Sequence, residues 1–129
     1  MNLSETIRTS ILSLNTAPQG IATGTILNGA SLSGVIDLRT VGVPVAIQMD
    51  AAWDTNAVTF QGSYDNVTWT DLRVAGVEES IAGVVASSME PLVYGHFLAP
   101  RYLKVRSGTA GAPVNQVGNT VITVIARPI

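Results

Sequence analysis

Apolar residues recur at every second position in several short stretches of this chain, and this spacing constrains its fold more than any other feature. Every odd position from Val41 to Met49 is apolar, which predicts a half-buried β-strand. Pro44 lies inside the stretch and has no N–H to donate, so we expect this strand to lie at a sheet edge or to contain a bulge. Residues 57–63 and 101–107 alternate in the same way and predict two more strands.

The alternation also predicts which side chains face the core. Lys104 and Arg106 should face outward, and residues 121–126, apolar on both faces, should form a central strand. Short strands separated by Gly, Pro and Asn turns are typical of an all-β sandwich or jelly roll. The side chains predicted to face inward are Val58, Phe60, Leu103 and Val105.

A β-hairpin is predicted between residues 57–63 and 67–72. Asp65 and Asn66 are turn residues, because both bond readily to nearby backbone and tolerate left-handed geometry. The large aromatic side chains of the two strands should lie across from each other, between the sheets of the sandwich. The core hairpin residues are therefore Phe60, Asp65, Asn66 and Trp69.

The N-terminal part of the chain differs from the rest. It contains apolar residues roughly one helical turn apart, and the following residues 20–34 are rich in Gly, Ser and Thr, as in flexible linkers. We expect an N-terminal arm and linker over residues 1–25, and a single β-sandwich domain over residues 26–129. The arm residues predicted to form an assembly interface are Leu3, Ile7, Ile11 and Leu14.

Charged residues are scarce. They make up 12% of this chain, against about 25% of an ordinary soluble domain. A charge-poor surface favours association, so we expect other protein to cover much of it, in a homo-oligomer with a trimer favoured. The alternative is a small monomer coated with Thr and Ser.

The charge balance and the apolar runs argue against two classes of partner. A net charge of −2 gives no basic stripe for nucleic acid. The longest apolar runs are far shorter than the roughly 20 residues that span a bilayer. The N-terminus also lacks the basic and apolar regions of a signal peptide. We therefore expect neither nucleic acid nor membrane as a partner.

Candidate catalytic groups are few. His96 is the only histidine and there is no cysteine, so His clusters and thiolate metal sites are excluded. No serine lies in a Gly-x-Ser-x-Gly motif. The paired acids that could hydrolyse glycosides fall in turn-like segments; these pairs are Asp50 with Asp54, and Glu78 with Glu79. The loop acids that could instead bind calcium have no recognised spacing; they are Asp50, Asp54 and Asp65. We predict no enzymatic activity, no metal and no cofactor.

Two stretches resemble known proteins. Residues 60–69 are similar to the hairpin motif S-x-D-G-x-x-W, with Asn66 in place of Gly. Residues 101–116 resemble the RYLKVRSGT…PVNQ stretch of small tailed-bacteriophage structural proteins, in which G-x-x-L-S-G-x-x-D-L and AAW segments precede the hairpin. This chain has both segments, at residues 29–38 and 51–53. The resemblance covers residues 28–127, and a weaker one to discoidin-type jelly rolls supports that topology.

The phage resemblance implies a virion component that is assembled in the host cytoplasm. We expect a capsid decoration (cement) protein on the capsid surface, with the major capsid protein as partner. The alternative is a head-fibre or tail adsorption module that binds host glycan, for which an exposed aromatic platform is needed. The candidates for that platform are Trp53, Trp69, Tyr64 and Tyr94.

Overall fold

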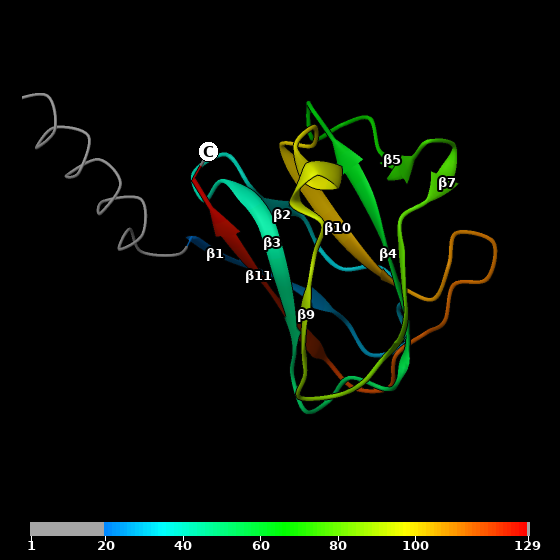
Figure 1. Cartoon of the computed structure of the whole chain (residues 1–129). Coiled ribbons are helices and arrows are strands. Elements are labelled where there is room, and N and C mark those ends of the chain that lie inside the picture. The colour runs from blue at the N-terminus through cyan, green and yellow to red at the C-terminus, as the bar shows by residue number, and fades with distance from the viewer. Residues whose placement is uncertain (1–19, 129) are drawn as a thin grey trace, which may run out of the picture.

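The computed structural model describes residues 20–128, which form two antiparallel β-sheets packed face to face (Figure 1). The first sheet has the order β1-β11-β3-β9, and the second has the order β2-β10-β4, with β5 and β8 both paired to β4. The strands of the first sheet are β1 (Gly20–Ile26), β3 (Val43–Met49), β9 (Met89–Pro91) and β11 (Thr120–Arg127). Those of the second are β2 (Ile36–Asp37), β4 (Asn56–Ser63), β5 (Thr70–Asp71), β8 (Ser80–Val84) and β10 (Tyr102–Ser107).

The chain passes from one sheet to the other at most connections. Strands β6 (Arg73–Val74) and β7 (Val77–Glu78) form a small separate hairpin. Without this hairpin and β5, the two sheets have the orders β1-β11-β3-β9 and β2-β10-β4-β8. Eight strands in two such sheets form a jelly roll. The predicted all-β sandwich is therefore confirmed. Residues 1–19 of the predicted arm and linker lie outside the described residues, together with the interface candidates Leu3, Ile7, Ile11 and Leu14.

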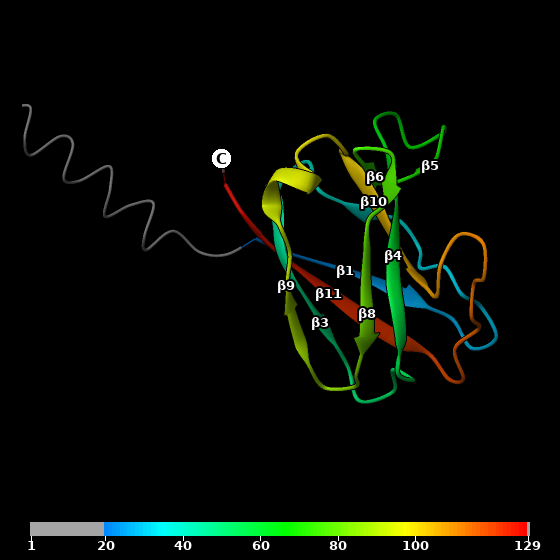
Figure 2. The same ribbon diagram turned by 45° about the vertical axis from the view of Figure 1, so that its right-hand side comes forward.

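The core lies between the sheets and is built from the alternating side chains that the sequence predicts. Val58, Phe60, Leu103 and Val105 are all fully buried there. The rings of Phe60 and Phe97 pack edge to face at 4.9 Å, the geometry that aromatic pairs prefer. Phe97 ends the 3₁₀ helix η1 (Tyr94–Phe97), which closes one end of the sandwich beside β9 (Figure 2).

Strand β3 contains the bulge that Pro44 predicts. Pro44 pairs with Ala126 and Ala46 pairs with Ile125, so Val45 has no partner on β11. Since β3 lies between β11 and β9, the alternative of an edge strand is excluded. The extra residue also ends the alternation, which is why Pro44 is buried whereas Val45 is only half-buried.

The prediction of a linker up to residue 25 is wrong for residues 20–25, because β1 begins at Gly20 and pairs with β11 along its whole length. The glycines here allow close packing. A Cβ on Gly24 would lie 2.7 Å from the Ile36 side chain, and one on Gly20 would lie 2.4 Å from the Val41 carbonyl oxygen. Strand β11 is central in its sheet, as predicted, although Val121 on its outer face is 40% exposed.

The hairpin after β4 has a longer turn than predicted, because residues 64–69 rather than residues 64–66 separate β4 from β5. Gly62 pairs with Thr70, and successive side chains of a strand point to opposite faces of the sheet. Trp69, the neighbour of Thr70, therefore lies on the face opposite to Gly62 and Phe60. The prediction that Trp69 lies in the core is wrong: its ring is on the outer face of the second sheet, 4.3 Å from the Lys104 ammonium.

Trp53 is the tryptophan that the core contains. It is 2% exposed, and its Nε1–H donates to the Val84 carbonyl oxygen at 2.9 Å. Within residues 20–128, no helix is long and apolar enough to cross a membrane.

Candidate functional site

The loop between β4 and β5 is held by side-chain hydrogen bonds around Asp65. Its Oδ1 accepts from the backbone N–H groups of Val67 and Thr68 at 2.9 and 2.8 Å. The Ser63 hydroxyl donates to the same oxygen at 3.0 Å and accepts from the Asn66 N–H at 2.9 Å. These bonds stabilise the turn that Asp65 and Asn66 were predicted to form.

Asn66 adopts the left-handed conformation predicted for it, with φ 60°. Asn66→Val should destabilise the protein by about 1 kcal/mol or more, because β-branched residues are strained at positive φ. Asn66→Gly should leave the stability unchanged or slightly raised, and urea unfolding of both variants measures the difference. Equal stability of the Gly and Val variants would show that the left-handed position is not strained.

The hydrogen bonds to Asp65 make this turn sensitive to acid. Donation from the Thr68 and Val67 N–H groups lowers the pKa of Asp65 below its ordinary value of 3.8. A carboxyl with a lowered folded-state pKa contributes stability above its unfolded-state pKa and loses it as the pH falls through the folded value. Below about pH 4 the wild type should therefore lose more stability than Asp65→Asn, as measured by thermal unfolding at pH 5 and pH 2.5. Parallel losses in the two proteins would contradict this.

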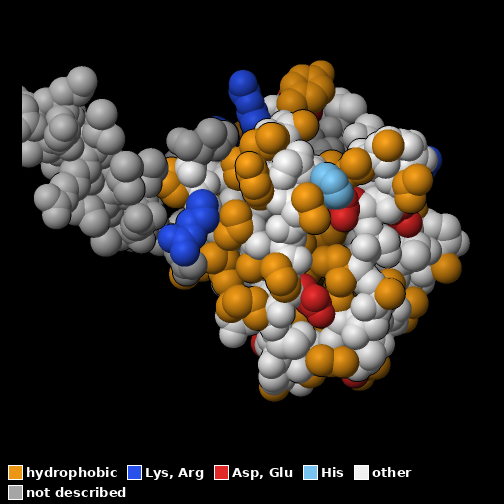
Figure 3. All heavy atoms as spheres, viewed as in Figure 1, with side chains coloured by type: hydrophobic (Ala, Val, Ile, Leu, Met, Phe, Trp, Pro, Cys, Tyr) orange, Lys and Arg blue, Asp and Glu red, His pale blue; other side chains and the backbone are white. Residues whose placement is uncertain are grey.

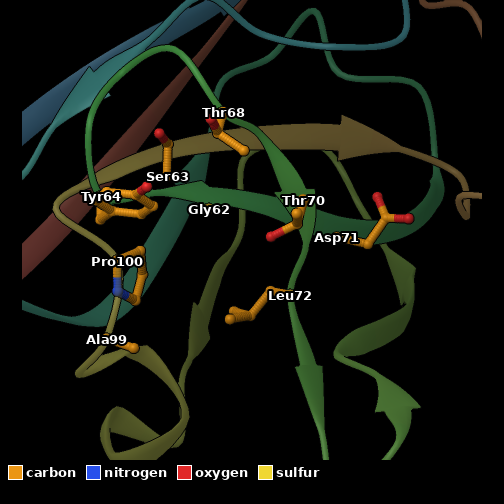
Figure 4. A pocket seen from close by; sticks show the side chains of 9 residues that line it. All are labelled: Gly62, Ser63, Tyr64, Thr68, Thr70, Asp71, Leu72, Ala99 and Pro100. Carbon is orange, nitrogen blue, oxygen red and sulfur yellow. The ribbon is translucent and has the colours of Figure 1, made fainter.

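A shallow pocket of about 240 Å³ lies beside the same loop. Figure 4 shows Tyr64 and Pro100 on one side of it, facing Leu72 and Thr70 on the other. Tyr64 is 69% exposed, so the pocket combines an accessible aromatic ring with hydroxyl groups. Its one carboxylate, Asp71, points away toward Arg106. The full lining is Gly62, Ser63, Tyr64, Thr68, Thr70, Asp71, Leu72, Ala99 and Pro100.

Arg106 forms a buried ionic cluster on the outer face of the second sheet. Its Nη2 lies 2.7 Å from Asp71 Oδ1, and its Nη1 lies 3.4 Å from Glu78 Oε2 and from Thr59 Oγ1. The prediction that Arg106 faces outward is confirmed, but its side chain is only 8% exposed, because β5 and β7 bring the acids over it. Asp71 and Glu78 are thus occupied in structural pairing.

The remaining candidate acids also serve the fold. Asp50 accepts from the N–H groups of Ala52 and Val121 at 3.0 and 2.8 Å, and so ties two loops together. Asp54 accepts from the Val117 N–H at 3.3 Å. Glu79 is hydrogen-bonded to Nδ1 of His96 in η1. The paired acids do not converge on a common cavity, and in the described part of the chain no group of three or more His, Asp or Glu could hold a metal ion.

The outer face of the first sheet is uncharged except at one end, where β11 ends with the exposed Arg127. Its side chains alternate with the core residues of β1, β3 and β11. An apolar row crosses all four strands through the paired residues Ile21, Ile125, Ala46 and Pro91, of which the two central ones are buried. Figure 3 shows hydrophobic side chains gathered over β3 and β9, with an acidic side chain among them. The uncharged residues of the outer face are Ile21, Thr23, Thr25, Ala46, Gln48, Met89, Pro91, Val121, Thr123 and Ile125.

An apolar groove of about 250 Å³ lies at one end of this sheet, where η1 meets the ends of β3 and β11. Tyr94 and Leu98 are its most exposed members, at 62% and 53%. Its lining is Val43, Val45, Tyr94, Leu98, Arg127 and Pro128. The sequence analysis did not find this groove, although the apolar run over residues 91–100 was a signal for it.

No family model matches this chain, and no curated protein matches it.

Proposed function

We propose that this chain is a non-enzymatic virion structural protein, a capsid decoration protein that binds the major capsid protein lattice as a homo-oligomer, with a trimer favoured. The observation that carries the proposal is the outer face of the β1-β11-β3-β9 sheet, which is uncharged except for Arg127 at one end. The resemblance of residues 28–127 to tailed-phage structural proteins supports the virion setting.

The outer face suits contact with protein better than contact with water. Ile21 is 60% exposed and Met89 is 55% exposed, and no charged side chain lies between them. Contiguous uncharged, partly apolar surfaces mark interaction sites in soluble proteins. The charge of this protein is instead concentrated elsewhere, as in the Arg106 cluster on the opposite sheet.

Binding to particles that lack the protein tests this function. Gln48→Lys places a charge in the middle of the outer face and should lower the affinity for particles at least tenfold, because an unpaired charge buried in an interface is strongly unfavourable. Asn115→Lys makes the same change of amide to ammonium at an exposed loop position and should bind as the wild type does. Occupancy is measured by sedimentation of particles with labelled protein.

Two outcomes would contradict the proposal. Equal binding of Gln48→Lys and Asn115→Lys would show that the outer face is not the attachment surface. Failure of the wild-type protein to bind any particle would remove the decoration function itself.

The pocket beside Tyr64 favours a second candidate, an adsorption module that binds host glycan. An exposed aromatic ring next to the hydroxyl of Thr70 can stack on a sugar and bond to it. If the wild type binds host cells rather than particles, and Tyr64→Ala abolishes that binding, the adsorption function replaces decoration.

A further inference from the structure

We propose that the apolar groove between η1 and the ends of β3 and β11 receives the N-terminal segment of a second copy of this chain. An aliphatic side chain of that segment fills the groove. The candidates are Leu3, Ile7, Ile11 and Leu14. This contact would hold together the homo-oligomer of the proposed function, and the inference rests on that function.

The chemistry of the groove selects an aliphatic occupant. Its walls are the side chains of two valines, a leucine, a tyrosine and a proline, and Arg127 is the only charged member. Tyr94 and Leu98 lie more than half exposed at its rim. A branched aliphatic side chain would remove this apolar surface from water without burying an unpaired polar group.

The N-terminal segment joins the body at the same end of the sheet. Gly20 pairs with Ala126, and the next residue along β11, Arg127, pairs with Val43 inside the groove. Leu14 precedes Gly20 by only six residues, so an extended chain places it within about 20 Å of that point. The segment is therefore within reach of the groove of an adjacent copy.

The low charge of the chain favours a second copy over the same one. Charged residues make up only 12% of the sequence, and a charge-poor surface favours association. A segment of one copy that enters the groove of the next gives a head-to-tail contact, which closes into a ring when the rotation fits.

A disulfide experiment on the full chain tests this contact. The sequence has no cysteine, so the pair Leu14→Cys with Leu98→Cys is unambiguous. After mild oxidation we expect covalent dimers and trimers on a non-reducing gel, at least fivefold above either single-cysteine variant, and their disappearance with reductant. Leu14→Cys with Tyr94→Cys, at the same rim, provides a second pair should the first variant fold poorly.

The matched control places the second cysteine at Val117, which is 75% exposed and precedes the opposite end of β11. This pair should give no covalent trimer. Cross-linking equal to that of the Val117 control would show that the segment does not occupy the groove. An internal disulfide in a monomer would show that it covers the groove of its own copy.

The experiment separates this inference from the proposed function, because it uses no particles. If the protein forms covalent trimers but does not bind particles, the proposed contact between copies stands and the proposed decoration function is wrong. If it binds particles but does not cross-link, the decoration function stands and the proposed contact is wrong. In addition, Leu98→Asp should reduce the mass in light scattering from oligomer to monomer at the same concentration, and an unchanged mass would contradict the contact.

Discussion

Trp53→Ala is expected to lower the free energy of unfolding by about 3–5 kcal/mol, as large-to-small changes in a core do. Trp53 is almost fully buried, and its indole N–H is bonded to the Val84 carbonyl. Alanine would leave a cavity and also deprive that carbonyl oxygen of its donor. Urea unfolding followed by circular dichroism measures the loss.

Trp69→Ala provides the matched comparison and should lower the stability by only about 1 kcal/mol. The Trp69 ring is half-buried on the outer face of the second sheet, where it makes a cation–π contact with the Lys104 ammonium. Such a contact is worth about 0.5–1 kcal/mol at exposed sites. A loss from Trp69→Ala that equals or exceeds the loss from Trp53→Ala would contradict the register of the β4–β5 hairpin.

Removal of both acids from the Arg106 cluster should also have a large effect. The double variant Asp71→Ala and Glu78→Ala leaves a buried guanidinium without a counter-charge, a change that typically costs about 3–5 kcal/mol. Because Asp71 is 37% exposed in the native pair, water screens part of this interaction. We therefore expect the free energy of unfolding to fall by about 3 kcal/mol.

Arg106→Met is the informative comparison for that cluster. It removes the buried charge and keeps an apolar chain of similar length, while both acids can turn toward water. We expect it to cost less than half as much as the double variant in the same urea assay. If Arg106→Met were the more damaging change, packing of the Arg106 chain rather than charge pairing would hold the β5–β7 segment in place.

The fold was predictable wherever a local pattern determines the structure. Alternation of apolar residues identified β3, β4 and β10, because successive side chains of a strand point to opposite faces. The run of residues 121–126, apolar on both faces, identified most of β11 as a central strand. Pro44 predicted the bulge, since it lacks the N–H that a regular ladder needs. The Asp65 and Asn66 turn was predicted for the same kind of reason, namely the chemistry of two adjacent residues.

Features that depend on distant residues were not predictable. The glycines of β1 were interpreted as a flexible linker, whereas the approach of Ile36 and Val41 explains their small size. The pairing of Gly62 with Thr70 places Trp69 on the outer face of the second sheet, and the local pattern did not show this register. Local alternation also could not show that two acids from β5 and β7 would cover Arg106.

The surface proposed to bind the capsid also depends on residues that are distant in the sequence. The outer face of the first sheet joins residues of β1, β11, β3 and β9, which lie far apart in the sequence. Only the strand order brings Ile21, Ile125, Ala46 and Pro91 into one row. The low overall charge predicted that such a surface exists, and the sheet register assigns its position.

The number of copies per particle tests the central claim most directly, namely that this charge-poor jelly roll decorates a capsid lattice. Under the proposal, a phage encodes this chain, and quantitative mass spectrometry of its purified virions would give the ratio of the chain to the major capsid protein. Decoration predicts on the order of hundreds of copies, in a fixed ratio set by the symmetry of the lattice. A count of a few to a few dozen would place the protein in a fibre or tail, and its absence from the particle would contradict the proposal altogether.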